Sequence, residues 1–142
     1  MEKDILRLHQ LMAKGQCCTQ ILVSLGLDLL GEENDRMVRA VSGLCRGVQS
    51  GLLCGALTGA ALMMSLFDEK MAAEEMIPEL VEWFQGEYGE AYGGTDCDTI
   101  LEGFPGNKTM RCPKLIESAY REAKEILEDF GFDIEGMARE AF

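Results

Sequence analysis

Glycine recurs at every fourth position of one segment, SGLCRGVQSGLLCGALTG at residues 42–59. Inside a helix each glycine costs ~1 kcal/mol relative to alanine, so a row of glycines needs a compensating contact. Residues four apart lie on the same face of a helix. In a helix that begins near Gly51, the residues Gly51, Gly55 and Gly59 form a smooth strip. The sequence therefore predicts a helix whose glycine face lies against the backbone of another helix.

Helical periodicity extends over most of the remaining chain. The apolar run at 52–67 is shorter than the ~20 residues that span a bilayer and is rich in small residues, which favours a buried central helix. Pro113 is expected to open a long helix that Gly131 ends. No alternating pattern of strand length occurs. We therefore predict an all-α fold, a single domain over residues 1–142 with six or seven helices around the glycine-rich helix.

The charge of the chain excludes several classes of function. It carries 25 acidic and 13 basic residues, a formal net charge of -12. Nucleic acids and anionic membrane surfaces attract basic faces, so we expect neither as a partner, and no membrane insertion. Residues 1–10 are charged and amphipathic and lack the apolar core of a signal peptide. We therefore expect a cytoplasmic protein.

The chain has six cysteines, which need an explanation in a cytoplasmic protein. Because cytoplasmic thiols are mostly reduced, a structural disulfide framework is not expected. Three interpretations stay open: reversible redox chemistry, metal ligation, and burial as small hydrophobic side chains. Paired Cys-x-x-Cys ligands and ferredoxin-type runs are missing from the sequence, which makes a metal the less favoured interpretation.

Several cysteines are predicted to lie at the start of a helix. The N-terminus of a helix stabilises an anion, and the thiolate is the reactive form of cysteine. The residues concerned are Cys17 and Cys18 after Gly15, Cys54 after Gly51, Cys97 in a helix capped by Thr95 or Asp96, and Cys112 immediately before Pro113. Arg111 and Lys114 flank Cys112, whereas Asp96 and Asp98 flank Cys97. On these local grounds Cys112 is the best candidate for a reactive thiol.

The cysteine pattern resembles that of the C_GCAxxG_C_C family, whose members are described as redox-active proteins. The central element is CGALTG at 54–59, and the resemblance extends over roughly residues 15–130. It assigns the family's cysteines to Cys18 in GQCCTQ, Cys54 in CGALTG, Cys97 in DCDTIL and Cys112 in CPKLIESAY. Cys17 and Cys45 depart from the family pattern as additional thiols. The resemblance implies a small helical protein that uses thiol chemistry.

The leading hypothesis is a cytoplasmic redox protein, a candidate thiol–disulfide oxidoreductase without a cofactor. Cys18, Cys54, Cys97 and Cys112 then converge at one end of the bundle and exchange electrons with a redox partner protein or a small thiol or disulfide. One alternative is a zinc or iron–sulfur protein that uses the same four cysteines. Another is a non-enzymatic helical interaction module with structural cysteines. Whether the chain forms a homodimer is left open.

A pairing of the four thiols follows from spacing and helix ends. Cys97 and Cys112 are close in sequence, and both are expected near helix N-termini, so we predict that they form one redox pair. Cys18 and Cys54 then form an inner pair across the glycine contact. The pairings Cys54–Cys112 and Cys18–Cys97 stay open as alternatives.

Overall fold

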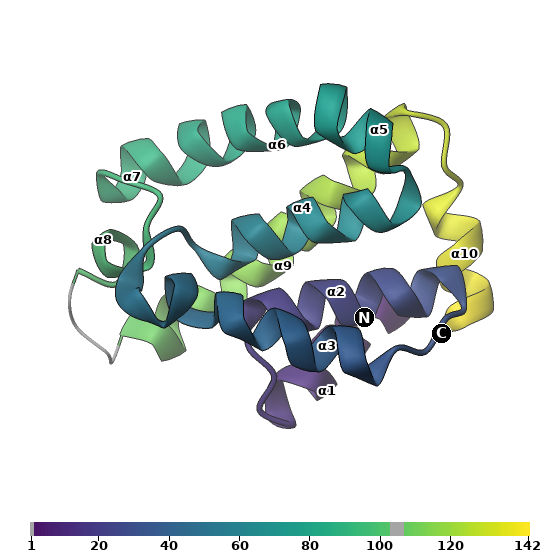
Figure 1. The fold of residues 1–142 in the computed structure, drawn as a ribbon, viewed down its shortest axis with the longest axis horizontal. Helices are drawn as coiled ribbons and strands as arrows, with labels where there is room; N and C mark the ends of the chain where they lie inside the picture. Colours follow the sequence, from purple (N-terminus) through teal and green to yellow (C-terminus); the bar gives the residue numbers. More distant parts are fainter. Residues whose placement is uncertain (1, 103–106) are drawn as a thin grey trace.

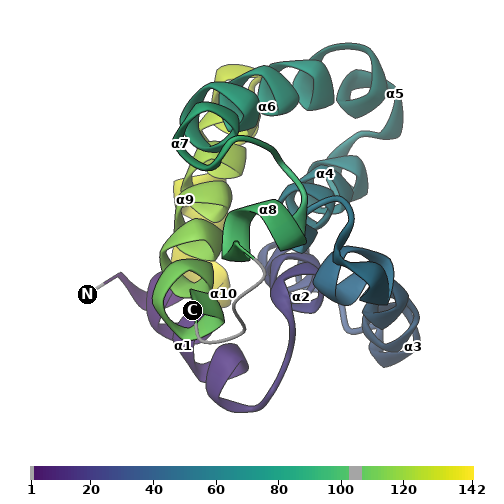
Figure 2. The same cartoon turned by 90° about the vertical axis from the view of Figure 1, so that its left-hand side faces the viewer.

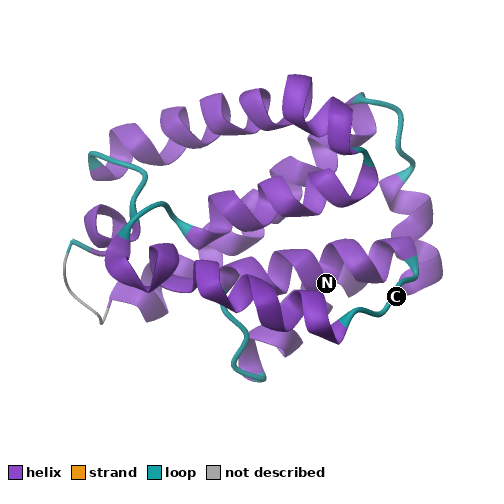
Figure 3. Cartoon of the chain, viewed as in Figure 1, coloured by secondary structure: helices purple, strands orange, loops and turns teal. Residues whose placement is uncertain are grey.

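The computed structural model describes residues 2–102 and 107–142, and this part of the chain is all-α, as predicted (Figures 1 and 3). Apart from one isolated bridge between Leu53 and Asp96, no β-structure occurs in the described residues. The helices are α1 (Lys3–Ala13), α2 (Cys18–Leu30), α3 (Asp35–Ala40), α4 (Gly55–Phe67), α5 (Glu69–Met71), α6 (Ile77–Phe84), α7 (Glu90–Tyr92), α8 (Cys97–Leu101), α9 (Asn107–Asp129) and α10 (Ile134–Ala141). Two π-helical turns, Ala72–Met76 and Gln85–Gly89, join α5, α6 and α7 into one helical path.

Helix α4 lies at the centre of the bundle, as the apolar run predicts. It packs against α2, α9 and α6, and Figure 1 shows it between α6 above and α2 below. Ala56, Ala60, Met63 and Met64 of α4 are fully buried. In the described part of the chain, no helix has the length and apolar character needed to cross a membrane.

The glycine face of α4 packs on α2. A Cβ atom at Gly59 would lie 2.9 Å from Leu22 Cδ1 and 3.0 Å from Thr19 Cα, and one at Gly55 would lie 2.9 Å from Thr19 Oγ1. The prediction of a close helix neighbour is therefore supported for these two glycines. Gly51 differs, because it lies in the loop before α4 with a positive φ of 73°, and the Asp98 side chain packs against it.

Local side-chain and glycine signals mark several helix ends. Gly31 ends α2 in the left-handed conformation, and the Asn34 side chain accepts the Met37 N–H at 3.0 Å to cap α3. Asp96 caps α8 by accepting the Thr99 N–H at 2.9 Å.

The prediction that Pro113 opens the long helix is wrong. Helix α9 begins at Asn107 and runs through Pro113, so Cys112 lies inside it rather than at its N-cap. Inside a helix a proline removes one backbone hydrogen bond and its ring crowds the carbonyl four residues earlier, so the helix needs other contacts to continue. Leu115, Ile116 and later apolar residues of α9 are buried, and this packing stabilises the helix across the proline.

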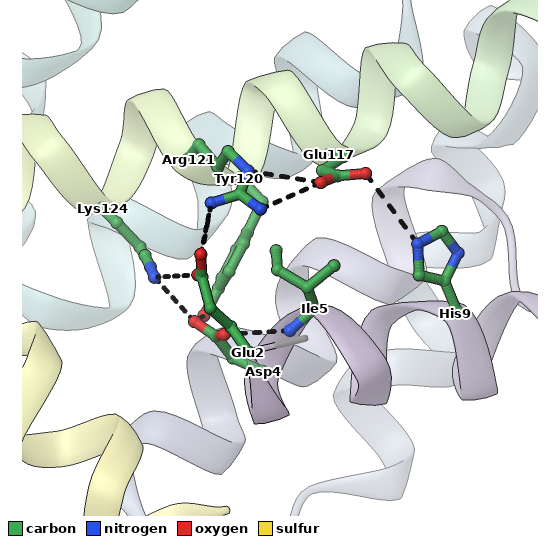
Figure 4. A network of polar contacts seen from close by, with 8 residues as sticks. All are labelled: Glu2, Asp4, Ile5, His9, Glu117, Tyr120, Arg121 and Lys124. Carbon is green, nitrogen blue, oxygen red and sulfur yellow. Dashed lines mark hydrogen bonds and ion pairs between the residues drawn. The ribbon is translucent and has the colours of Figure 1, made fainter.

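A buried carboxylate fastens the N-terminal helix to α9 (Figure 4). Asp4 is only 4% exposed and accepts hydrogen bonds from Tyr120 Oη at 2.8 Å and Lys124 Nζ at 2.7 Å. Burial raises the pKa of Asp4, but the bonds from Lys124, Tyr120 and the Ile5 N–H outweigh it, so the pKa is lowered overall. The network holds α1 over the core, and the sequence pattern gave no sign of it.

Candidate functional site

Four cysteines in the thiol form line one cavity of about 710 Å³ at an end of the bundle. Cys18 is the first residue of α2, Cys54 immediately precedes α4, Cys97 is the first residue of α8, and Cys112 lies in α9. The corresponding ends of these helices gather at the left of Figure 1 and toward the viewer in Figure 2. The structure thus brings together the four cysteines named from sequence, while their chemical roles stay a prediction.

A short backbone pairing places Cys54 beside Cys97. The Cys54 N–H donates to the Thr95 carbonyl at 3.0 Å, and the Cys97 N–H donates to the Leu52 carbonyl at 2.6 Å. These bonds flank the antiparallel bridge between Leu53 and Asp96. Because the segments before α4 and α8 run side by side, the helices begin next to each other and present their first thiols together.

Hydrogen bonds divide the four thiols into two pairs. The Cys54 thiol bonds to the sulfur of Cys97, and the Cys18 thiol bonds to that of Cys112. These pairs differ from the expected ones, which were Cys97 with Cys112 and Cys18 with Cys54. Cys54 is 5% exposed, whereas the other three thiols are half-buried. A small molecule in the cavity can therefore reach Cys97 more easily than Cys54.

The environment favours the thiolate at Cys97 and the thiol at its partner. The hydrogen bond from Cys54 lowers the pKa of Cys97 to about 7; burial opposes this, and the Gly55 N–H adds to it. Negative charge on Asp98 and Asp96 raises the Cys97 pKa, as expected from sequence, but does not prevail. The Gly55 N–H belongs to the first turn of α4, so the dipole of that helix points at the sulfur.

The pKa values of Cys54 and Cys18 are raised, whereas that of Cys97 is lowered. The hydrogen bond to Cys97, together with burial, raises the pKa of Cys54 well above its usual range. The hydrogen bond to Cys112 and burial likewise raise the pKa of Cys18. Because Cys112 is not at a helix start, the sequence argument for it as the reactive thiol loses its helix-end contribution and keeps only the flanking Arg111 and Lys114. The structural argument for a reactive thiol points to Cys97.

The two additional cysteines form a disulfide, contrary to the expectation that no structural disulfide is present. Cys17 and Cys45 are bonded, with Cα atoms 5.8 Å apart and a sequence separation of 28. The bond joins the residue before α2 to the end of the 3₁₀ turn Val41–Leu44. Cys17 lines the cavity, whereas Cys45 is 7% exposed. Their shared departure from the family pattern is the one sequence signal that could have paired them.

The residues after Cys45 form a left-handed turn at the rim of the cavity. Arg46, Gly47, Val48 and Gln49 have φ values of 55°, 62°, 59° and 57°. Residues with a side chain cost ~1–2 kcal/mol each in this conformation. Gln49 Nε2 donates to the Ser42 carbonyl at 3.2 Å, which helps to hold the turn. The sequence analysis did not foresee positive φ at the three larger residues.

In the part of the chain whose side chains the structure describes, no group of three or more His, Cys, Asp or Glu residues is arranged to hold a metal ion. The cysteines named for the alternative zinc or iron–sulfur site are the same four that line the cavity.

Comparison with protein families identifies the chain over most of its length. The family model described as "Putative redox-active protein (C_GCAxxG_C_C)" matches residues 16–126, a span that contains all six cysteines. No curated protein and no solved structure matches the chain significantly. The family match agrees with the four cavity cysteines and with the CGALTG element that starts α4. The chain belongs to the C_GCAxxG_C_C family.

Proposed function

We propose that this chain is a cytoplasmic thiol–disulfide oxidoreductase in which Cys54 and Cys97 cycle between dithiol and disulfide. The observation that supports this is the asymmetric pair itself, with a Cys54 thiol donating to a Cys97 sulfur of pKa about 7. A thiolate with a pKa near neutral pH is the form that attacks disulfides fastest. The family description as redox-active agrees with this chemistry.

The first step forms a mixed disulfide. The Cys97 thiolate attacks one sulfur of a substrate disulfide, a bond forms between Cys97 Sγ and that sulfur, and the other half leaves as a thiolate that takes a proton from solvent. Cys97 is half-buried and lines the cavity, so it is the sulfur of the pair that a substrate meets.

The second step resolves the mixed disulfide. Cys54 loses its proton to solvent or to the departing thiolate and attacks Cys97 Sγ, which releases the second substrate half as a thiol. The substrate disulfide gains two electrons and two protons, and Cys54 and Cys97 become a disulfide. A dithiol reductant, either a redox partner protein or a small thiol, returns the pair to its reduced form.

The protein thus needs no resident cofactor for this cycle. Cys18 and Cys112 lie in the same cavity as a second hydrogen-bonded pair. Negative charge on Cys54 or Cys97 raises the pKa of Cys18, so the charge state of one pair affects the titration of the other. We assign this second pair to the exchange of electrons between the Cys54–Cys97 disulfide and the external reductant.

Trapping of the mixed disulfide tests the proposal. Reduced Cys54→Ser protein, treated anaerobically with hydroxyethyl disulfide, is expected to keep a mercaptoethanol adduct on Cys97, detectable by peptide mass spectrometry. Cys97→Ser is the matched control, because it removes the other sulfur of the same pair and is expected to form no adduct at Cys54. In the unmodified chain the expected product is a Cys54–Cys97 disulfide.

Two outcomes contradict the proposal. One is an adduct that forms first on Cys112 or Cys18 with Cys97 unmodified. The other is stoichiometric iron or zinc in anaerobically purified protein that is lost on substitution of the cavity cysteines, which supports the metal-binding alternative. Circular dichroism of each variant establishes that it is folded.

A further inference from the structure

The cavity that holds the thiols has the size of a small-molecule site. Its volume of about 710 Å³ lies within the range of roughly 300–1,000 Å³ typical of ligand pockets. Its wall is apolar at Met12, Ile100, Leu115 and Ile116. The Cys54 side chain is only 5% exposed, so a small molecule reaches its sulfur more readily than a protein-sized partner does.

Two opposite charges stand at this cavity. Arg46 comes from the left-handed turn and Asp98 from the first turn of α8, and both line the cavity wall. Both are exposed, and within the described residues neither forms an ion pair with another side chain. The wall therefore offers a substrate one cationic and one anionic group beside the thiols.

The structure also fixes where these charges lie. Arg46 directly follows Cys45, whose bond to Cys17 fastens the turn to the start of α2. The Asp98 side chain packs against Gly51 at the other end of the same loop, where a Cβ atom would collide with the carboxylate. Both groups are thus positioned by the loop from residue 45 to residue 51.

We propose that the substrate is a low-molecular-weight disulfide with amino-acid ends, in which a carboxylate binds Arg46 and an ammonium group binds Asp98. A guanidinium group binds a carboxylate through two parallel hydrogen bonds, and a carboxylate accepts hydrogen bonds from an ammonium group. Cystine represents this class. The proposal rests on the proposed function, because it specifies the disulfide that Cys97 attacks.

Four small disulfides separate the contributions of the two charges. Cystine carries carboxylates and ammonium groups, dithiodipropionate only carboxylates, cystamine only ammonium groups, and hydroxyethyl disulfide none. Second-order rates of reaction with reduced protein are measured for each, with Arg46→Gln and Asp98→Asn as variants. Arg36→Gln is the matched control, because Arg36 is an exposed arginine of α3 outside the cavity.

The readout is the rate of each variant relative to the unmodified chain, divided by the same ratio for hydroxyethyl disulfide. The ratio of variant to unmodified chain cancels the leaving-group chemistry of each disulfide. The division by the hydroxyethyl disulfide ratio cancels any change that Asp98→Asn causes in the pKa of nearby Cys97. Arg46→Gln is expected to slow cystine and dithiodipropionate about two- to fivefold, and Asp98→Asn to slow cystine and cystamine similarly, as for exposed charge-assisted bonds. Arg36→Gln is expected to change none of the ratios.

The possible failures are distinguishable. Equal ratios for all four disulfides in both variants would overturn the substrate class while leaving the redox function intact. A protein disulfide such as insulin that reacts faster than cystine, with no effect of Arg46→Gln or Asp98→Asn, overturns it as well. If Cys97 reacts with none of the disulfides, hydroxyethyl disulfide included, the proposed function itself is contradicted.

Discussion

Substitution of Cys54 by alanine is expected to raise the pKa of Cys97. The pKa is lowered from 9.0 to about 7, and the hydrogen bond from Cys54 is the largest cause. At pH 7 about half of Cys97 is thiolate, compared with about 1% for a cysteine at its ordinary pKa. In Cys54→Ala the Gly55 N–H still stabilises the anion, but burial and the charges on Asp98 and Asp96 outweigh it, so we expect the pKa to rise to 9.0 or above.

The pH dependence of alkylation measures this pKa directly. Reduced protein reacts with limiting iodoacetamide between pH 5 and pH 10, and mass spectrometry quantifies alkylation of the peptide that contains Cys97. The rate follows the thiolate fraction, so the midpoint of the profile is the pKa of Cys97. The expected midpoint is about 7 in the unmodified chain and 9.0 or above in Cys54→Ala.

Cys18→Ala is the matched control for this measurement. It removes a thiol from the same cavity, but the main causes of the Cys97 shift are Cys54, burial, Gly55, Asp98 and Asp96. We therefore expect its midpoint to stay close to that of the unmodified chain. A midpoint that stays near 7 in Cys54→Ala, or equal shifts in both variants, refutes the assignment of Cys54 as the group that stabilises the thiolate.

Three further predictions concern stability, each measured as the free energy of unfolding in urea. The Cys17–Cys45 disulfide closes a loop with a sequence separation of 28. Its removal in Cys17→Ser/Cys45→Ser is expected to lower the free energy of unfolding by ~3–4 kcal/mol through loop-closure entropy. An equal midpoint with and without reductant in the unmodified chain contradicts this. Gly59→Leu is expected to cost ~1–3 kcal/mol by overpacking, and Gly86→Leu much less, because Gly86 faces open space. Asp4→Asn is expected to cost ~2–3 kcal/mol at neutral pH through its charge-assisted hydrogen bonds. Because the folded-state pKa of Asp4 is lowered, its contribution is present above pH 3.8 and lost as the pH falls further, so this difference shrinks in acid.

The features that depend on neighbouring residues could be predicted from sequence. Helical periodicity, the caps at Asn34 and Asp96, and the glycine that ends α2 all act within a few residues. The close approach at Gly55 and Gly59 follows from the same local geometry, and the expectation of Cys18 opposite Cys54 across the glycine contact already pointed to the helix that is α2.

Features that depend on distant contacts were missed or mispaired. The Cys54–Cys97 pair depends on the bridge between Leu53 and Asp96, and nothing in either short segment predicts a strand. The disulfide joins residues 28 apart in sequence. Pro113 was expected to start a helix because local preference favours that position, whereas α9 begins at Asn107 and includes the proline.

The environment assigns different roles to two identical side chains. One hydrogen bond lowers the pKa of Cys97 and raises that of Cys54, because the proton that stabilises one sulfur as an anion is held on the other. The first turn of α4 supports both: the Gly55 N–H binds Cys97, and the Ala56 and Leu57 N–H groups bind Cys54. Once Cys97 is tied up in a mixed disulfide, its negative charge is gone and it no longer holds the Cys54 proton in place. The pKa of Cys54 then falls, because the Ala56 and Leu57 N–H groups still stabilise its thiolate and only burial opposes them, so the helix end that activates the attacking sulfur also helps to activate the resolving one, in that order.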